Sequence, residues 1–180
     1  MRKVLYRTVV LLGLWLPLLL YAQNFQFVPS SGNNSITTCD GWICDFGGPN
    51  QNYGNNWDGY MVIYPATAGE MVAITSGSYS TESGWDYVYV YSGVGTGGTL
   101  LATLTGAGSI TTSIISTAAN GALTIRFKSD GSICYYSGFA FYVQCVSPVV
   151  MSNNPLTTCS AIWTDPGGLG NYGNNQYCPK

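Results

Sequence analysis

The chain has 180 residues, only 8% of them charged, and it contains no histidine. This length is enough for one ordinary domain and not for two large ones. Without histidine, a Ser-His or Cys-His nucleophile pair is excluded, and we expect no catalytic residues and no enzyme activity. The formal net charge of −2 makes nucleic acid a poor candidate for a partner.

Residues 1–22 are predicted to be a secretory signal peptide. Arg2, Lys3 and Arg7 precede an apolar run, "VVLLGLWLPLLL", and the small residue Ala22 ends the segment. The alternative is an uncleaved anchor, because the run is near the lower limit for spanning a bilayer. Cleavage removes three of the six basic residues, so the net charge falls from −2 to −5. We therefore expect a secreted, extracellular protein whose mature chain does not insert into a membrane.

Six cysteines in an exported chain are typical of disulfide bonds. Metal binding by thiolates is the weaker interpretation, because the chain has no CxxC pair and no histidine. The positions are Cys39, Cys44, Cys134, Cys145, Cys159 and Cys178.

Residues 23–35 are expected to form a flexible lead-in, and short apolar runs separated by Gly, Pro and Asn follow. The runs are rich in Val, Ile, Thr, Tyr and Phe, and several of them alternate with a period of two. They lie at 59–65, 70–75, 86–92, 100–105, 110–115, 122–127 and 138–144. No stretch after residue 22 has a helical period, so the pattern predicts an all-β sandwich or barrel.

A pair of carboxylates stands at the start of one expected strand. Glu82 and Asp86 flank Ser83-Gly84, and a turn there brings both carboxylates to one point. Asp130, in the "SDGS" loop after another strand, is a third candidate. Clustered carboxylates repel each other unless a cation or a proton lies between them, and Ca²⁺ binds carboxylate and carbonyl oxygens. The alternative roles are a turn for Asp130, a cap for Asp86 and a surface charge for Glu82.

The C-terminal residues repeat an earlier segment. "TTCDGWICDFGGPNQNYGNN" begins at Thr37, and "TTCSAIWTDPGGLGNYGNN" begins at Thr157, with Asp45 recurring as Asp165. Cys39 and Cys159 are 159 − 39 = 120 residues apart, and a repeat with this spacing corresponds to a whole domain. We expect one domain at 36–147, a linker at 148–156 and the truncated start of a second copy at 157–180. Alternatively, the tail is a complete disulfide-closed appendage.

These motifs resemble the CUB domain, an antiparallel, jelly-roll-like extracellular β-sandwich. The resemblance rests on the Asn-Tyr-Gly-Asn-Asn block, "GYMVIYPATAGEMVAI", "ESGWDYVYVYSG" and "LTIRFKSDGSICYYSGFAFYV". It implies a calcium site formed by Glu82, Asp86 and Asp130 and supported by the hydroxyl of Tyr53, with further ligands among the carbonyls of 131–133. The loop from Glu82 to Asp86 is shorter than in many animal members, which weakens the match at Glu82.

The resemblance also implies disulfides, although many animal members have two cysteines that this chain lacks. Cys39 and Cys145 bracket the domain, which implies Cys39–Cys145 with Cys44–Cys134, and Cys159–Cys178 in the second copy. Cys39–Cys44 with Cys134–Cys145 is the main alternative, because four cysteines allow three connectivities.

The function that the resemblance implies is a calcium-binding module that contacts an extracellular protein or glycan. Tyr135, Tyr136 and Trp85 lie in loops and are the residues that we expect to contact such a partner. Two alternatives remain: the N-terminal accessory region of a larger extracellular enzyme such as a peptidase, or a structural spacer in an adhesin-like array.

Overall fold

A computed structural model describes residues 24–133, 135–150 and 161–164. Its described residues form β-strands and no helix, which confirms the all-β prediction. No helix in this part of the chain is therefore long and apolar enough to cross a membrane. The strands are β1 (Phe25–Phe27), β2 (Ser31–Thr37), β3 (Asp40–Cys44), β4 (Asp58–Tyr64), β5 (Met71–Ser80), β6 (Tyr87–Ser92), β7 (Thr99–Leu104), β8 (Ala107–Ser109), β9 (Ile114–Ile115), β10 (Leu123–Lys128), β11 (Gly138–Val150) and β12 (Ala161–Thr164).

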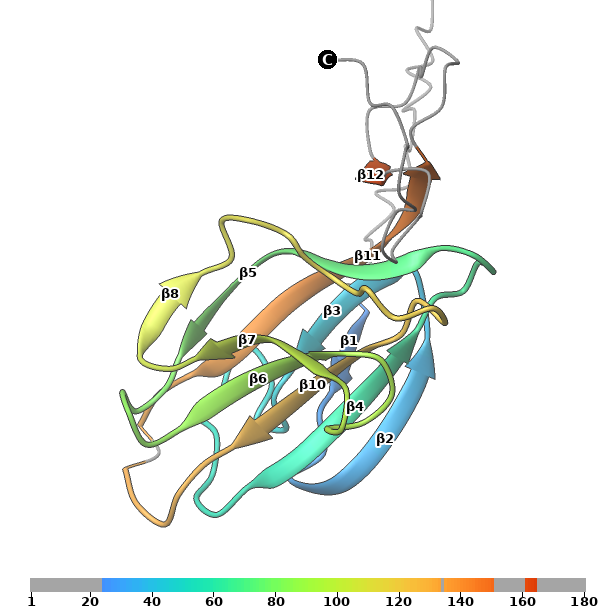
Figure 1. Ribbon diagram of the computed structural model, residues 1–180. Helices are drawn as coiled ribbons and strands as arrows, with labels where there is room; N and C mark the ends of the chain where they lie inside the picture. Colours follow the sequence, from blue (N-terminus) through green and yellow to red (C-terminus); the bar gives the residue numbers. More distant parts are fainter. Residues whose placement is uncertain (1–23, 134, 151–160, 165–180) are drawn as a thin grey trace, which may run out of the picture.

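The strands form two sheets that face each other as a sandwich (Figure 1). One sheet has the order β2-β4-β10-β6-β7. The other has the order β1-β3-β11-β5-β8, with β9 beside β5 and β12 beside the end of β11. Neighbouring strands are antiparallel except for three pairs, which are β1 with β3, β2 with β4, and β11 with β12.

Alternation along the strands places the core between the two sheets. On β6, Val88 and Val90 have no exposed surface, whereas Tyr87, Tyr89 and Tyr91 lie half-buried on the outer face. On β10, the inward residues Leu123, Ile125 and Phe127 are buried. Phe127 contacts Phe139 of the opposite sheet, with ring centroids 5.9 Å apart. Such contacts between inner faces are what hold a sandwich together.

The lead-in predicted at 23–35 is not a loop, because it contains β1 and most of β2. Phe25 of β1 contacts Trp42 of β3 with ring centroids 6.3 Å apart, and Val28 is 1% exposed in the core. β2 lies along β4 with nearly every side chain exposed. Its polar sequence therefore carries no alternation, and only main-chain pairing makes it a strand.

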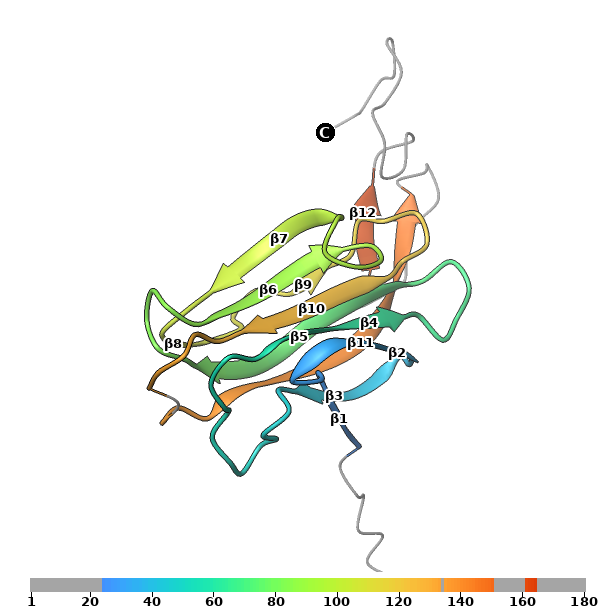
Figure 2. The ribbon, with the colours of Figure 1, turned by 90° about the horizontal axis from the view of Figure 1, so that it is seen from below.

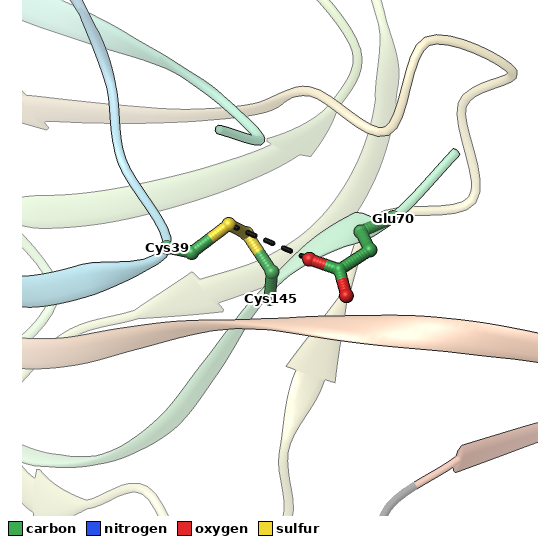
Figure 3. A group of neighbouring side chains, drawn as sticks. All are labelled: Cys39, Glu70 and Cys145. Carbon is green, nitrogen blue, oxygen red and sulfur yellow. Dashed lines mark hydrogen bonds between the residues drawn. A yellow bond between two sulfur atoms is a disulfide. The ribbon is translucent and has the colours of Figure 1, made fainter. Parts of the chain in front are cut away.

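A disulfide joins Cys39 to Cys145, the pairing expected of cysteines that bracket the domain. It excludes the alternative in which Cys39 pairs with Cys44. Figure 3 shows Glu70 beside this bond, with its Oε2 3.6 Å from Cys39 Sγ. Both sulfur atoms are bonded to each other, so this group is not a metal site. Cys44 is buried and forms no disulfide with a described residue; its proposed partner Cys134 lies outside the described residues, as do Cys159 and Cys178.

Candidate metal centre

Two loops at one end of the sandwich bring three carboxylates together. Glu82 and Asp86 lie in the connection from β5 to β6, and Asp130 follows β10 (Figure 1). One oxygen atom from each carboxylate lies within 4.8 Å of the other two. The three residues proposed from the sequence as metal ligands are thus neighbours in the structure.

The segment from Glu82 to Asp86 is a tight turn, as Ser83-Gly84 predicted. The N–H groups of Trp85 and Asp86 donate to the carbonyl of Glu82 at 3.3 and 3.0 Å. Gly84 has φ +81°, in the left-handed region that favours glycine. Thr105, which the sequence analysis did not single out, accepts from Gly84 N and donates to the Glu82 carbonyl. The turn therefore rests on the segment between β7 and β8.

Asp86 is the buried anchor of the cluster. Its carboxylate is fully shielded and accepts two hydrogen bonds, from Tyr53 Oη at 2.5 Å and from Asp130 N at 2.8 Å. Tyr53 Oη in turn accepts from Glu82 N at 3.0 Å. Tyr53 is 1% exposed, and burial followed by the bond to Asp86 raises its pKa. The expected supporting hydroxyl thus connects Asp86 to the main chain at Glu82.

The Asn-Tyr-Gly-Asn-Asn block, residues 52–56, braces the loop that carries Asp130. Asn56 N donates to the Asp130 carbonyl at 2.6 Å, and Asn55 Nδ2 donates to the Gly131 carbonyl at 3.1 Å. Asp130 Oδ1 accepts from Ser132 N at 2.9 Å. The Gly131 carbonyl, one of the further ligands expected from the sequence, therefore already has a hydrogen-bond partner.

Glu82 is the member of the cluster with an unsatisfied carboxylate oxygen. Its Oε2 atom is shielded from solvent and has no hydrogen-bond partner among the described residues. Burial, followed by the charges of Asp130 and Asp86, raises the pKa of Glu82. A buried carboxylate oxygen without a donor costs free energy that a cation would recover. The donor set, all oxygen, fits a hard ion such as Ca²⁺.

Neither a protein-family model nor a curated protein matches the chain. Among solved structures, the CUB1-EGF-CUB2 domains of rat MASP-1 match 63% of this chain and 42% of that chain, at 21% identity and a TM-score of 0.52. The MASP-1 CUB2 domain bound to Ca²⁺ matches 62% of this chain and 96% of that chain, at 22% identity and a TM-score of 0.50.

The chain has the CUB fold. The full extracellular region of zebrafish Gpr126/Adgrg6 also matches, at 24% identity, with a TM-score of 0.50 and 64% of this chain covered. That match covers only 15% of the zebrafish protein. The chain therefore covers less than half of the CUB1-EGF-CUB2 chain of rat MASP-1 and less than half of the extracellular region of the zebrafish protein.

Exposed apolar side chains surround the acidic end of the CUB sandwich. Trp85 is 65% exposed and Tyr135 is 82% exposed, as their proposed contact role requires. Tyr136 differs, because it packs against the core and its carbonyl accepts from Tyr53 N. Phe46 and Ile133 are also exposed, and the sequence analysis named neither as a contact residue.

Asp45 lies apart from the acidic cluster and has a structural role. Its buried carboxylate accepts from Gly47 N at 2.8 Å and from Phe139 N at 2.9 Å, which ties the end of β3 to the start of β11. The first of these bonds closes a turn at Asp45. Gly138 is needed beside it, because a Cβ there would lie 1.9 Å from Asp45 Oδ2. Burial, opposed in part by these N–H donors, raises the pKa of Asp45 to about 6.

This pKa shift predicts how Asp45 affects stability. A carboxyl whose pKa rises on folding favours the folded state when protonated and opposes it when ionised. We expect the free energy of unfolding, relative to that of Asp45→Asn, to fall by up to about 3 kcal/mol between pH 4 and pH 7, at about 1.4 kcal/mol per pKa unit. Urea unfolding of both proteins in chelator, over this pH range, measures the difference. A difference that is constant, or that grows with pH, would contradict the prediction.

Proposed function

We propose that this chain is an extracellular, calcium-dependent binding module of the CUB type with no catalytic role. The observation that carries the proposal is the unpartnered Oε2 of Glu82 beside two further carboxylates. A cation at this point would replace the missing hydrogen-bond donor and neutralise part of the repulsion. The Ca²⁺-bound CUB2 domain of MASP-1 shares the fold and lends support to this choice of ion.

In this proposal each residue has a separate task. Glu82, Asp86 and Asp130 hold the ion through their carboxylates, and Tyr53 orients Asp86 while its hydroxyl fixes the main chain of Glu82. Such outer partners commonly matter almost as much as the ligands themselves. The ion would also join the β5–β6 connection to the loop after β10. Its binding would then order the surface that carries Trp85 and Tyr135.

The chemistry of the end surface favours an extracellular protein or glycan as partner. Three carboxylates around a divalent cation retain one negative charge, which complements a basic group of a partner. Trp85 and Tyr135 add exposed aromatic surface of the kind that provides anchors in interfaces. The chain covers 42% of the rat MASP-1 fragment that it matches, so a role as one module of a larger protein is consistent with the comparison.

Calcium affinity should depend on pH through Glu82. Because the pKa of Glu82 is raised, protons compete with Ca²⁺ at a higher pH than at an ordinary glutamate. We expect wild-type affinity to fall as the pH is lowered from 7.5 to 5. Glu82→Gln should bind Ca²⁺ at least about tenfold more weakly at pH 7.5 and should show a flatter pH dependence.

Isothermal titration with CaCl₂ measures this effect. Glu70→Gln is the matched control, because Glu70 is a half-buried glutamate that lies beside the disulfide and outside the cluster. Its calcium affinity should equal that of the wild type. Equal affinity and equal pH dependence in Glu82→Gln and wild type would show that Glu82 is not a ligand.

A further inference from the structure

The last strand of the sandwich continues beyond the sheet to which it belongs. Up to Val146, β11 pairs with β5, where Val146 lies opposite Met71. From Ser147 to Val150 it pairs instead with β12, in parallel, with Ser147 opposite Ala161 and Val150 opposite Thr164. Figure 2 shows β12 and the end of β11 projecting past the two sheets. Residues 148–150, expected to begin a linker, are therefore part of a strand.

The segment that follows repeats the chain around β2 and β3. The sequence Asn-Asn-Ser-Ile-Thr-Thr-Cys at 33–39 returns as Asn-Asn-Pro-Leu-Thr-Thr-Cys at 153–159. With the cysteines aligned, residues 161–164 of β12 correspond to residues 41–44 of β3. The repeat thus starts before the second Thr-Thr-Cys, and β12 is the counterpart of β3.

The strand pairs agree with this correspondence. In the first unit, β3 is paired in parallel with β1, a short strand that precedes it in the chain. β12 is likewise paired in parallel with the end of β11, which also precedes it. The sequence repeat and the strand pairing assign the same role to the end of β11.

We propose that Ser147–Val150 is the first strand of a second CUB-like unit, so that two consecutive units share one continuous strand. The junction then has no flexible linker. A strand paired on both sides of the junction restricts the angle between units, whereas a linker of nine residues would leave it free.

The direction of the shared strand sets the direction of the two units. β11 starts at the acidic end, where Phe139 bonds to Asp45 and Tyr136 to Tyr53, and it runs away from that end. β1 runs the opposite way in the first unit, because it is parallel to β3, which ends beside Asp45. In a second unit, the end of β11 would take the place of β1 and would run toward the end of that unit that corresponds to the acidic end. That end would therefore lie on the side of the second unit that is farther from the junction. In such a pair the corresponding ends of the two units would point in opposite directions.

Backbone NMR of residues 23–180, isotopically labelled, tests the proposal. We expect cross-strand contacts between residue 147 and residue 161 and between residue 150 and residue 164. We also expect slow exchange of the amides that face β12 among residues 147, 149 and 150, because Pro148 has no N–H. Antiparallel contacts, such as 147 with 164, would overturn the opposed arrangement. If neither the parallel nor the antiparallel contacts are found, and the amides of 147, 149 and 150 exchange fast, the shared strand itself is overturned.

A pair of proline variants separates the junction from the sandwich. Ile162→Pro interrupts β12, because proline has no N–H and a fixed φ. Exchange of the β12-facing amides among 147, 149 and 150 should become at least about tenfold faster, while the exchange of 138–146 and the melting temperature of the sandwich stay unchanged. Asn154→Pro, between the two strands in sequence, is the matched control and should leave these amides protected. Equal protection in Ile162→Pro and wild type would contradict the shared strand.

Discussion

Replacing both Cys39 and Cys145 with serine lowers the free energy of unfolding by about 3–5 kcal/mol, the effect expected of a disulfide that closes a loop of roughly 100 residues. The sequence separation is 106, so the bond removes much of the freedom of the unfolded chain. Cys39 immediately precedes β3 and Cys145 lies in β11, so the bond also joins two strands that pair in the sheet.

Urea unfolding monitored by tryptophan fluorescence measures this loss. The dependence of the free energy of unfolding on urea concentration should become steeper, because the unfolded chain without the disulfide exposes more surface. Glu70→Gln is the matched control, since it removes the carboxylate beside the sulfur atoms and keeps the bond. Its stability should change by less than about 0.5 kcal/mol, as for most half-exposed surface changes. A loss below about 1 kcal/mol in the double serine variant would show that the bond contributes little, contrary to the loop-closure argument.

Asp86→Ala should both destabilise the fold and abolish calcium binding. The variant leaves the buried hydroxyl of Tyr53 and the N–H of Asp130 without their acceptor. Orphaning such groups costs about 2–4 kcal/mol in total, so the loss should appear even in chelator. Because the variant also removes one of the carboxylates, the calcium response should disappear as well.

Asp40→Ala provides a matched control for Asp86→Ala. Asp40 also accepts a hydrogen bond from a tyrosine, Tyr142, but this pair is exposed. Its loss should cost less than about 1 kcal/mol, because water replaces the missing partner. Thermal and urea unfolding, with and without Ca²⁺, compare the two variants. Similar small losses in both would mean that Asp86 is not the buried anchor of the site.

Strands with an alternating sequence were predictable, because one face of each is buried; β3 was missed although Ile43 and Cys44 are buried. The alternation of Val and Tyr in β6, and of Leu, Ile and Phe in β10, follows from burial on one face only. β1 and β2 were missed for the opposite reason. β1 is three residues long, and β2 is polar on both faces, so neither shows a period that propensity or alternation can detect.

The acidic cluster was predictable because a turn separates Glu82 from Asp86 and because Asp130 lies in a loop after another strand; the resemblance added Tyr53. The burial of Asp86 and the orphaned oxygen of Glu82 were not, since both depend on contacts across the fold. Tyr136 was expected on the surface because, like Tyr135, it lies in a loop close to Asp130 in the sequence. A side chain half-buried against the core cannot be told from an exposed neighbour by loop position alone.

Thermal unfolding of residues 23–180 in millimolar Ca²⁺ and in chelator tests calcium binding at the acidic cluster most directly. A ligand at about a hundred times its dissociation constant adds about 2.7 kcal/mol to the folded state, or roughly 5–10 °C for a chain of this size. We expect such a rise for the wild type and none for Asp130→Asn. Equal melting temperatures for the wild type in Ca²⁺ and in chelator would contradict this expectation.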